Sequence, residues 1–333
     1  MSFSDNKLTV GSPAELVTAV PYLLGFRPDD GSIVVVASRQ RRIVFAARAD
    51  LPAPSAPASQ LLHLADHLVS VVQRQQPITD VMLVGYGDAG PVDPALHLLD
   101  EALTTGGMTC RELVRVSGTR TFNLTCDDPA CCPPEGTPFD PTTSLVAVRA
   151  TAAGLVALPD RAAVAARFAP VDGAARARMR AATARALTRL SPVRTAGSRA
   201  IDKAGVQAVR DALRQHDGGT LLTDDEVAWL TLLLQHTAVR DSAVELTQPH
   251  DGHVTFWTEV TRRAEEPLVA APATVLAVTA WRCGDGALAG MAAERALQVD
   301  PDCRLADLML QALQAGVPPT VFDQATPTNP VIE

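Results

Sequence analysis

The pattern of apolar and polar positions divides the chain into two halves. In the first half, short continuous apolar runs alternate with helical patterns, and the runs at 33–37 and 81–84 suit strands buried on both faces. From about Thr142 only helical periodicity remains. We therefore predict an α/β domain over residues 1–142, a helical domain over 143–320, and a flexible tail over 321–333.

The elements expected in the first half follow from this pattern and from the turn residues that bound it. Helices are expected at 12–25, 60–75 and 94–105, and strands at 33–37, 43–49, 81–84, 109–116 and 119–124. Short polar links predict hairpins for the first two and the last two strands. The strand–helix–strand order elsewhere predicts a mixed, mainly parallel sheet with crossover helices. Pro21 either kinks or ends the first helix.

The second half is predicted to be all-helical. Helices are expected at about 202–216, 223–240, 252–265, 270–283, 286–299 and 303–315. Small residues at Gly284, Ala289 and Ala296 followed by Pro301 resemble the pattern of a tetratricopeptide helix pair. Only one such unit is visible, so a packed helical hairpin is the alternative to a partner-binding groove. Trp281 and Arg295 are the candidate partner-binding residues of this pair.

Composition and charge narrow the classes of function. Apolar residues make up 47% of the chain, which favours a globular fold, and no apolar stretch is long enough to span a bilayer. Aromatic residues are only 4% and the formal net charge is −8, which disfavours nucleic-acid binding. The N-terminal residues lack the basic start and apolar run of a signal peptide, so we expect a cytoplasmic, soluble protein.

The most unusual chemistry lies in the loop 126–136, which we call the Cys loop. It contains Cys126, Cys131 and Cys132, three of the six cysteines of the chain. Zinc prefers about four ligands at a structural site, and adjacent cysteines are poorly placed to bind one ion, so zinc is an alternative that we do not favour. A disulfide from Cys126 to either of the others, or buried thiols, is the favoured interpretation, with redox or catalytic chemistry the least favoured.

A glycine-rich loop follows the expected strand at 81–84. Gly85, Gly87 and Asp88 belong to the sequence G-Y-G-D-A-G, which has the G-x-G-x-x-G spacing of dinucleotide-binding loops. Pro91 and Pro94 are expected to delay the next helix, and the following strand ends without the acidic residue that such sites use. We interpret the segment as an ordinary loop, with nucleotide or anion binding as the alternative.

Histidine pairs and an arginine-rich stretch complete the candidates. His63 and His67 have the i, i+4 spacing of a helical metal site but lie beside the apolar face, which favours a solvated role. His250 and His253 flank an Asp-Gly turn, which favours a turn over a ligand set. Residues 161–199 contain nine arginines, which we expect to be mainly solvated or paired with carboxylates. At helical spacing Arg178, Arg185 and Arg189 share one face, and Arg176 and Arg180 share another.

Three separated segments together resemble one family. They are the opening Pro13…Pro28 segment, the Cys loop, and the late segment that runs from Gly284 to Pro301. Together they resemble an uncharacterised actinobacterial family, domain of unknown function 4192, over about residues 9–319. The resemblance implies no activity. It also implies large aromatic residues just before the first cysteine of the loop, where this chain has only Phe122.

Two functions are compatible with these features, and no Walker A, nucleophile-elbow, zincin or kinase motif favours an enzyme. The leading hypothesis is a cytoplasmic, non-enzymatic binding or scaffold protein whose helical half engages another protein. The alternative is a small-molecule or nucleotide sensor, or an enzyme, with its site at the glycine-rich loop beside the Cys loop.

Overall fold

The structure is a computed structural model that describes residues 11–40, 42–75, 77–141 and 144–325. By contacts between residues the chain divides into two compact units. The α/β unit holds the described residues up to Val164 together with the segment Gln314–Pro318, and the helical unit holds Ala165–Leu313 and the described residues from Pro319 onward. This division falls after the change of composition at residue 143.

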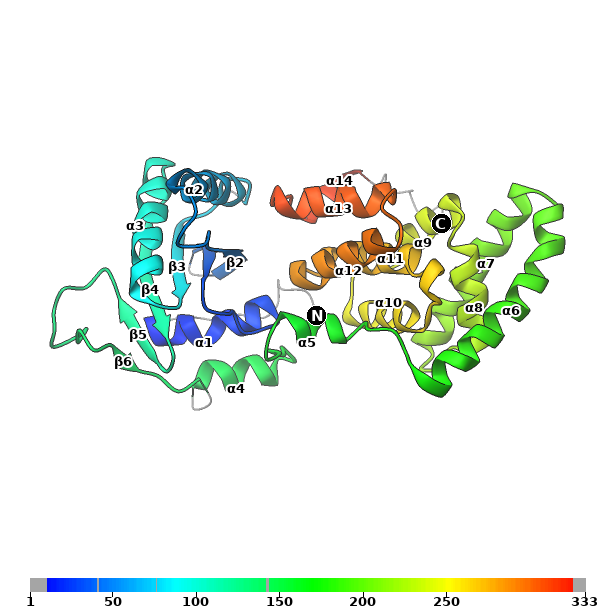
Figure 1. The fold of residues 1–333 in the computed structure, drawn as a ribbon, viewed down its shortest axis with the longest axis horizontal. Helices are drawn as coiled ribbons and strands as arrows, with labels where there is room; N and C mark the ends of the chain where they lie inside the picture. The colour runs from blue at the N-terminus through cyan, green and yellow to red at the C-terminus, as the bar shows by residue number, and fades with distance from the viewer. Residues whose placement is uncertain (1–10, 41, 76, 142–143, 326–333) are drawn as a thin grey trace, which may run out of the picture. The chain divides into compact units, whose positions relative to one another are not determined.

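A six-stranded mixed sheet forms the centre of the α/β unit, as the pattern predicts (Figure 1). Its strands stand in the order β2-β1-β3-β4-β5-β6. They are β1 (Ser32–Arg39), β2 (Arg42–Asp50), β3 (Asp80–Tyr86), β4 (Cys110–Ser117), β5 (Arg120–Asn123) and β6 (Thr137–Pro138). The hairpins β1–β2 and β4–β5 are confirmed.

The sheet has less parallel character than the sequence pattern suggests. Only β3 and β4 pair in parallel, and the other four neighbouring pairs are antiparallel. The reason is that β3 lies beside β1 and not beside β2, although β2 precedes it in the chain. Since β1 and β2 form a hairpin, β3 runs antiparallel to its neighbour β1. One crossover, through the helix between β3 and β4, is therefore the source of the parallel pair.

Helices cover both faces of this sheet. They are α1 (Pro13–Leu24), α2 (Ala58–Gln73), α3 (Ala89–Thr105) and α4 (Leu145–Ala152). One core cluster joins α2 and α3 to side chains such as Ile33 and Leu83, and the other joins α1 and α4 to Val34 and Val84. Neighbouring strand residues face opposite layers, which explains why β1 is apolar throughout. Because Val146 and Ala150 of α4 belong to the second cluster, the α/β unit continues past residue 143.

The first helix is built from the signals that its sequence carries. The Ser12 hydroxyl accepts a hydrogen bond from the backbone N–H of Glu15 at 3.3 Å, and Pro13 occupies the first turn. The helix continues through Pro21 and ends at Gly25, whose φ of 79° is left-handed. Of the two outcomes left open for Pro21, an end of the helix at that residue is therefore excluded.

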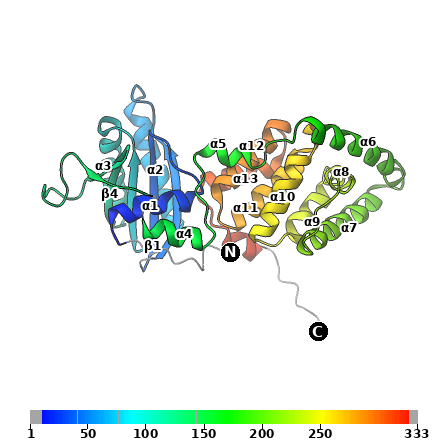
Figure 2. The ribbon, with the colours of Figure 1, turned by 90° about the horizontal axis from the view of Figure 1, so that it is seen from below.

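The helical unit is an assembly of consecutive helices (Figure 2). Helix α5 (Arg161–Ala166) spans the division between the units. The helices that follow are α6 (Gly173–Thr195), α7 (Ser198–Asp217), α8 (Asp224–Leu233), α9 (Thr237–Leu246), α10 (Asp251–Arg263), the 3₁₀ turn η1 (Glu266–Leu268), α11 (Ala270–Arg282), α12 (Gly286–Val299), α13 (Arg304–Gln314) and α14 (Thr320–Ala325). No helix among the described residues combines the length and the apolar character needed to cross a bilayer.

Two expectations for this half are corrected. The single helix expected at 223–240 is two helices, because side chains at the break bond to distant elements. Gln235 Nε2 donates to the Leu268 carbonyl at 3.1 Å, and His236 Nδ1 lies 2.8 Å from Asp202 Oδ1. Of the residues expected to form a flexible tail, 321–325 belong to α14, while 326–333 lie outside the described residues.

The core of the helical unit centres on α10 and α11. Trp257 is fully buried, its indole Nε1 donates to Thr247 Oγ1 at 3.0 Å, and its ring meets Phe256 edge-on with centroids 4.9 Å apart. All of α11 from Ala270 to Trp281 is buried. Small side chains let α12 approach it closely, since Ala289 and Ala296 are both fully buried. Helices α11 and α12 thus pack together as a helical hairpin.

Candidate functional site

The Cys loop brings three thiols together. The Sγ atoms of Cys126, Cys131 and Cys132 all lie within 4.8 Å of one another, and none of the three forms a disulfide. Cys131 is exposed, and the other two are half-buried. Hydrogen bonding with the Cys126 thiol raises the pKa of Cys132 to about 12, and the Cys131 thiol acts in the same direction. The residues that the sequence singled out therefore form one cluster, in which the Cys132 thiol is protonated at neutral pH.

A turn centred on Asp128 holds the second and third cysteines. The backbone N–H groups of Cys131 and Cys132 both donate to the Asp128 carbonyl, at 3.1 and 2.7 Å. The Asp128 carboxylate accepts from the Ala130 N–H at 2.9 Å. Aspartate side chains commonly close turns in this way. Asp128 is thus engaged in the turn, and neither Asp127 nor Cys110 is part of the cluster.

The ends of the Cys loop are fixed to the sheet. At its start Asn123 Oδ1 accepts from both the backbone and the hydroxyl of Thr125, at 3.0 and 2.7 Å. At its end Arg120 donates to the carbonyls of Glu135 and Gly136, at 3.1 and 2.7 Å. Gly136 has a φ of 79°, and a Cβ there would come within 2.7 Å of the Phe122 ring. The loop is therefore held in one shape at both ends.

Phe122 is the aromatic residue on which the loop closes. The Arg115 guanidinium lies 3.8 Å from the centroid of its ring, and Arg115 Nε donates to Asp93 Oδ1 at 2.8 Å. Such a cation–aromatic contact is stabilising when it is shielded from water, and Arg115 is buried. The single aromatic residue before Cys126 thus takes a structural part between the sheet and the loop.

The first two glycines of the glycine-rich loop take part in backbone pairing and in packing against α3. The N–H of Gly87 is engaged by the Val116 carbonyl at 2.9 Å, and a Cβ on Gly85 would lie 2.3 Å from Val92 of α3. At the start of the loop, Gly85 lets the sheet pack closely against α3, and the exposed Asp88 precedes the first residue of that helix. Helix α3 begins at Ala89, so the expected delay by Pro91 and Pro94 is wrong. Pro91 lies in the first helical turn, whose N–H groups need no internal partner, and Pro94 lies further inside the helix.

The histidine pairs have different surroundings. His63 and His67 are both exposed on α2. His253 is buried and joins His250 and Asp217, a residue that sequence spacing could not connect with them because it lies on α7. The ring Nδ1 of His253 accepts the Gln248 N–H at 2.9 Å, which leaves its proton on Nε2, directed at Asp217 Oδ1 at 3.2 Å. Both ring nitrogens of His253 are thus satisfied without a metal.

Burial also favours the neutral form of that histidine. Burial lowers the pKa of His253, and the nearby His250 acts in the same direction. A neutral imidazole that accepts at one nitrogen and donates at the other fits the two contacts described. The cluster of Asp217, His250 and His253 therefore joins α7 to the start of α10 as a structural contact.

The residues expected to bind a partner take part in the packing of the helical unit. Trp281 is buried in α11. Arg295 of α12 donates to both carboxylate oxygens of Glu266, at 2.9 and 2.8 Å, with only 19% of its side chain exposed. Both hydrogen bonds come from one nitrogen, Nη2, which ties the guanidinium of α12 to η1. Neither side chain is presented freely to a second protein in this conformation.

The arginine-rich stretch separates into two sets on α6. The first set, which we call the inner flank, contains Arg178, Arg185 and Arg189. Arg178 pairs with Asp224 at 3.2 Å, Arg185 with Asp225 at 2.6 Å, and Arg189 lies 4.1 Å from the centroid of the Trp229 ring. All three partners belong to α8, so the inner flank fastens α6 to that helix.

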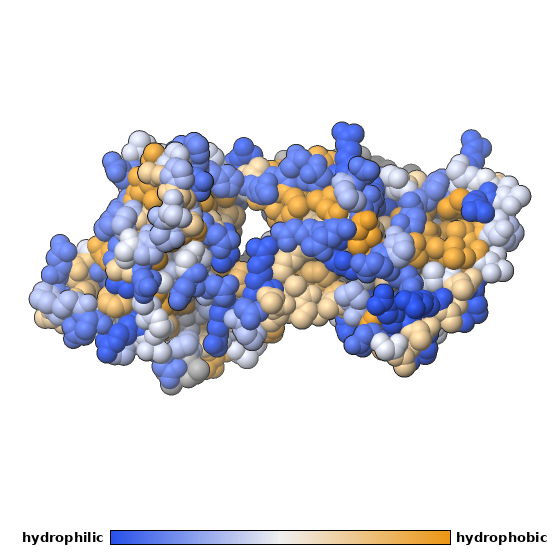
Figure 3. Space-filling view, viewed as in Figure 1, coloured by the Kyte–Doolittle hydropathy of each residue, from blue (hydrophilic) through white to orange (hydrophobic). Residues whose placement is uncertain are grey.

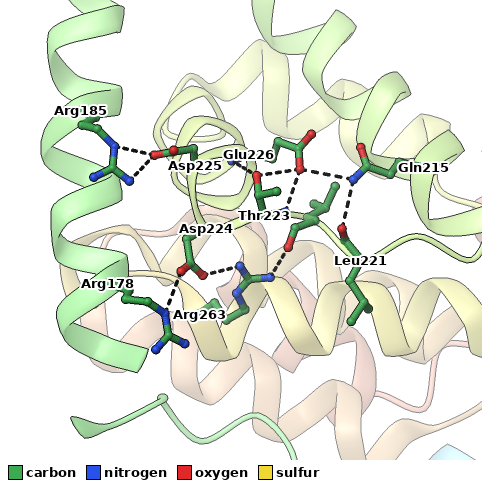
Figure 4. A network of polar contacts seen from close by, with 10 residues as sticks. Arg178, Arg185, Gln215, Leu221, Thr223, Asp224, Asp225, Glu226 and Arg263 are labelled. Atoms are coloured by element: carbon green, nitrogen blue, oxygen red, sulfur yellow. Dashed lines mark hydrogen bonds and ion pairs between the residues drawn. The ribbon is translucent and has the colours of Figure 1, made fainter. Parts of the chain in front are cut away.

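A polar network surrounds the start of α8 (Figure 4). Thr223 and Glu226 form a reciprocal capping box, as their spacing predicts, and Gln215 of α7 donates to Glu226 at 3.3 Å. The Asp224 carboxylate also accepts a hydrogen bond from Arg263 of α10 at 2.6 Å, and Arg263 donates a second one to the Leu222 carbonyl at 2.8 Å. The first turn of α8 thereby connects this helix to α6, α7 and α10.

The second set, the outer flank of α6, consists of Arg176, Arg180, Leu187 and Arg194. The last three are spaced by seven residues, which places them along one side of the helix. Leu187 is 53% exposed. Arg180 is largely exposed and lies 3.7 Å from Glu265 at the closest, and within the described part of the chain neither Arg176 nor Arg194 has an ion-pair partner. Helix α6 lies at the edge of its unit in both ribbon views (Figures 1 and 2).

The fold and these surfaces define an α/β unit with a thiol-bearing loop, joined to a helical unit with an arginine-lined outer helix. Residues 13–320 match the family described as Domain of unknown function (DUF4192), and the chain belongs to that family. No curated protein and no solved structure matches the chain. The assignment of function therefore rests on the geometry of the molecule.

Proposed function

We propose that this chain is a non-enzymatic binding protein that engages an acidic surface of another protein through the outer flank of α6. The observation that carries the proposal is the division of the α6 arginines into two flanks. The arginines of the inner flank contact side chains of α8. On the outer flank, Arg176 and Arg194 have no carboxylate partner among the described residues. An exposed leucine stands between these cations.

The chemistry of the outer flank supports a protein partner. Cations around an apolar side chain match a surface that carries carboxylates around an apolar recess, and arginine is enriched in protein interfaces. Figure 3 shows hydrophilic and apolar side chains adjoining one another over the end of the helical unit that holds α6–α8. The formal charge of −8 and the 4% of aromatic residues argue against nucleic acid as the partner.

The outer flank is ordered before a partner arrives. The inner flank and the network at α8 hold α6 along much of its length, and Met179, Ala182 and Ala186 pack inward. A surface fixed in advance loses little conformational entropy on binding. We propose that this activity is cytoplasmic, which is supported by the lack of a disulfide among the six cysteines in the structure, since disulfides are rare in reducing compartments.

Charge reversal on the outer flank tests the proposal. Tagged full-length protein should recover a partner from a lysate of the source organism, and the Arg176→Glu/Arg194→Glu variant should lose it, because two attractive contacts become repulsive. The matched control is Arg74→Glu/Arg210→Glu, which makes the same change in net charge. Arg74 lies at the end of α2 and Arg210 on α7, and both are exposed. Mass spectrometry of the recovered proteins provides the measurement. Equal recovery of the same proteins by both variants would refute the proposal.

A further inference from the structure

The Cys loop has the properties of a metal site. We propose that Cys126, Cys131 and Cys132 together bind one thiophilic divalent cation, of which Zn²⁺ is the natural example, with the fourth position left to water or an added ligand. The proposal is independent of the binding function assigned to α6, since it concerns a loop of the α/β unit.

Geometry answers the objection that the spacing of the cysteines raises. Adjacent cysteines normally direct their side chains apart, yet the Sγ atoms of Cys131 and Cys132 both lie within 4.8 Å of Cys126 Sγ and of each other. Three thiolates bound to one tetrahedral zinc at about 2.3 Å would stand roughly 3.8 Å apart. The cluster therefore needs only small side-chain adjustments to close around an ion.

The backbone explains why the sulfurs converge. The Asp128 carbonyl accepts both cysteine N–H groups, which folds the chain back toward Cys126. Arg120 and the packing of Gly136 on Phe122 keep the far end of the loop against the sheet. A site whose ligands are positioned before the ion arrives is favoured, because less of the binding energy is spent on ordering the loop.

The chemistry of the three thiols also favours a soft divalent cation. Binding of a divalent cation replaces three S–H protons by three metal–sulfur bonds and releases the protons to solvent. No oxidant or reductant is required. Thiolate ligands select zinc and related soft ions over magnesium and calcium.

Two disulfide alternatives compete with the metal site. Cys126 could pair with Cys131 or with Cys132 under oxidising conditions, and each pair would remove two of the three ligands. A disulfide and a metal site differ in the number of free thiols and in the response to added metal, so one experiment distinguishes them.

Titration with Co²⁺ provides the test, because sulfur-to-cobalt charge transfer reports thiolate coordination directly. Full-length protein, purified with reductant and stripped with chelator, should bind about one Co²⁺ with a charge-transfer band that Zn²⁺ abolishes, and should release protons as it does so. The Cys131→Ser/Cys132→Ser variant should lose the band. The control Cys110→Ala/Cys283→Ala should keep it, since neither residue belongs to the cluster.

The contrary outcomes are equally clear. Absence of a charge-transfer band in reduced wild-type protein, a band that survives in Cys131→Ser/Cys132→Ser, or a disulfide within the Cys loop of protein purified without oxidant would each overturn the proposal. Circular dichroism of both variants confirms that the fold is intact; for Cys131→Ser/Cys132→Ser this is expected because the loop lies outside the two core clusters of the α/β unit.

Discussion

Replacement of Gly85 by alanine is expected to destabilise the protein by about 1–3 kcal/mol. The new methyl group would lie 2.3 Å from Cγ1 of Val92 and 3.1 Å from Cδ1 of Leu96, both fully buried on α3. Neither side chain can move away into solvent, so α3 must shift from the sheet. Equilibrium unfolding in urea measures the loss as a lower midpoint with an unchanged slope.

Gly90→Ala is the matched control for this prediction. It changes the last glycine of the same G-x-G-x-x-G pattern, where a Cβ would meet nothing within 4 Å. Since alanine favours helix over glycine, the control should be as stable as wild type or slightly more so. If Gly85 serves packing, only its variant loses stability. Equal losses in both variants would contradict this account and would support a loop that needs its glycines for another purpose.

Replacement of Asp224 by asparagine is expected to cost about 1–2 kcal/mol near neutral pH. Asp224 pairs with Arg263 and Arg178, and only 27% of its side chain and 13% of that of Arg263 are exposed. The variant leaves the Arg263 guanidinium without its carboxylate. The estimate is kept low because the pair is in contact with solvent.

The dependence of this loss on pH has a definite sign. The hydrogen bond from Arg263 holds the pKa of Asp224 below its ordinary value. A carboxylate whose pKa is lowered on folding contributes stability above its unfolded pKa, and the contribution disappears as the pH falls through the lowered pKa. The difference in unfolding free energy between wild type and Asp224→Asn should therefore shrink as the pH falls below about 4.

Asp225→Asn controls for the position of Asp224 in the first turn of α8. It removes the same charge from the same helix terminus, but its partner Arg185 is 59% exposed and Asp225 itself 62%. A pair so exposed contributes about 0–1 kcal/mol, so the control should cost less. Urea unfolding of the three proteins across the acid range is the measurement. A larger loss for Asp225→Asn, or a loss at Asp224 that grows on acidification, would contradict the proposed role of the network.

Local patterns in the sequence predicted most of the elements, but not the neighbours of each strand. The apolar run of β1 correctly predicted burial on both faces. The same pattern could not show that β3 lies beside β1, because the sequence of a strand does not specify which strand pairs with it. The extent of parallel pairing was therefore overestimated. The break between α8 and α9 escaped notice for a related reason. It depends on bonds from Gln235 and His236 to residues more than thirty positions away.

The candidate sites show the same limit. Cysteine content alone marked the Cys loop, yet the convergence of all three sulfurs depends on the turn at Asp128, which spacing did not show. Helical spacing separated the arginines of α6 into two faces correctly. Which face would remain open could not be predicted, since Asp224 and Asp225, the partners of the inner flank, follow about forty residues later.

The central claim is that a partner lies directly on the outer flank of α6, and site-specific photo-crosslinking tests it most directly. A photoreactive residue at position 187 should form an adduct with the partner in cells. The same residue at position 181, which is also exposed but points about 120° away around the helix axis, should form none. Adducts from position 187 alone are the predicted result. Adducts from 181 alone, or from neither position while the partner is still recovered with the protein, would contradict the claim.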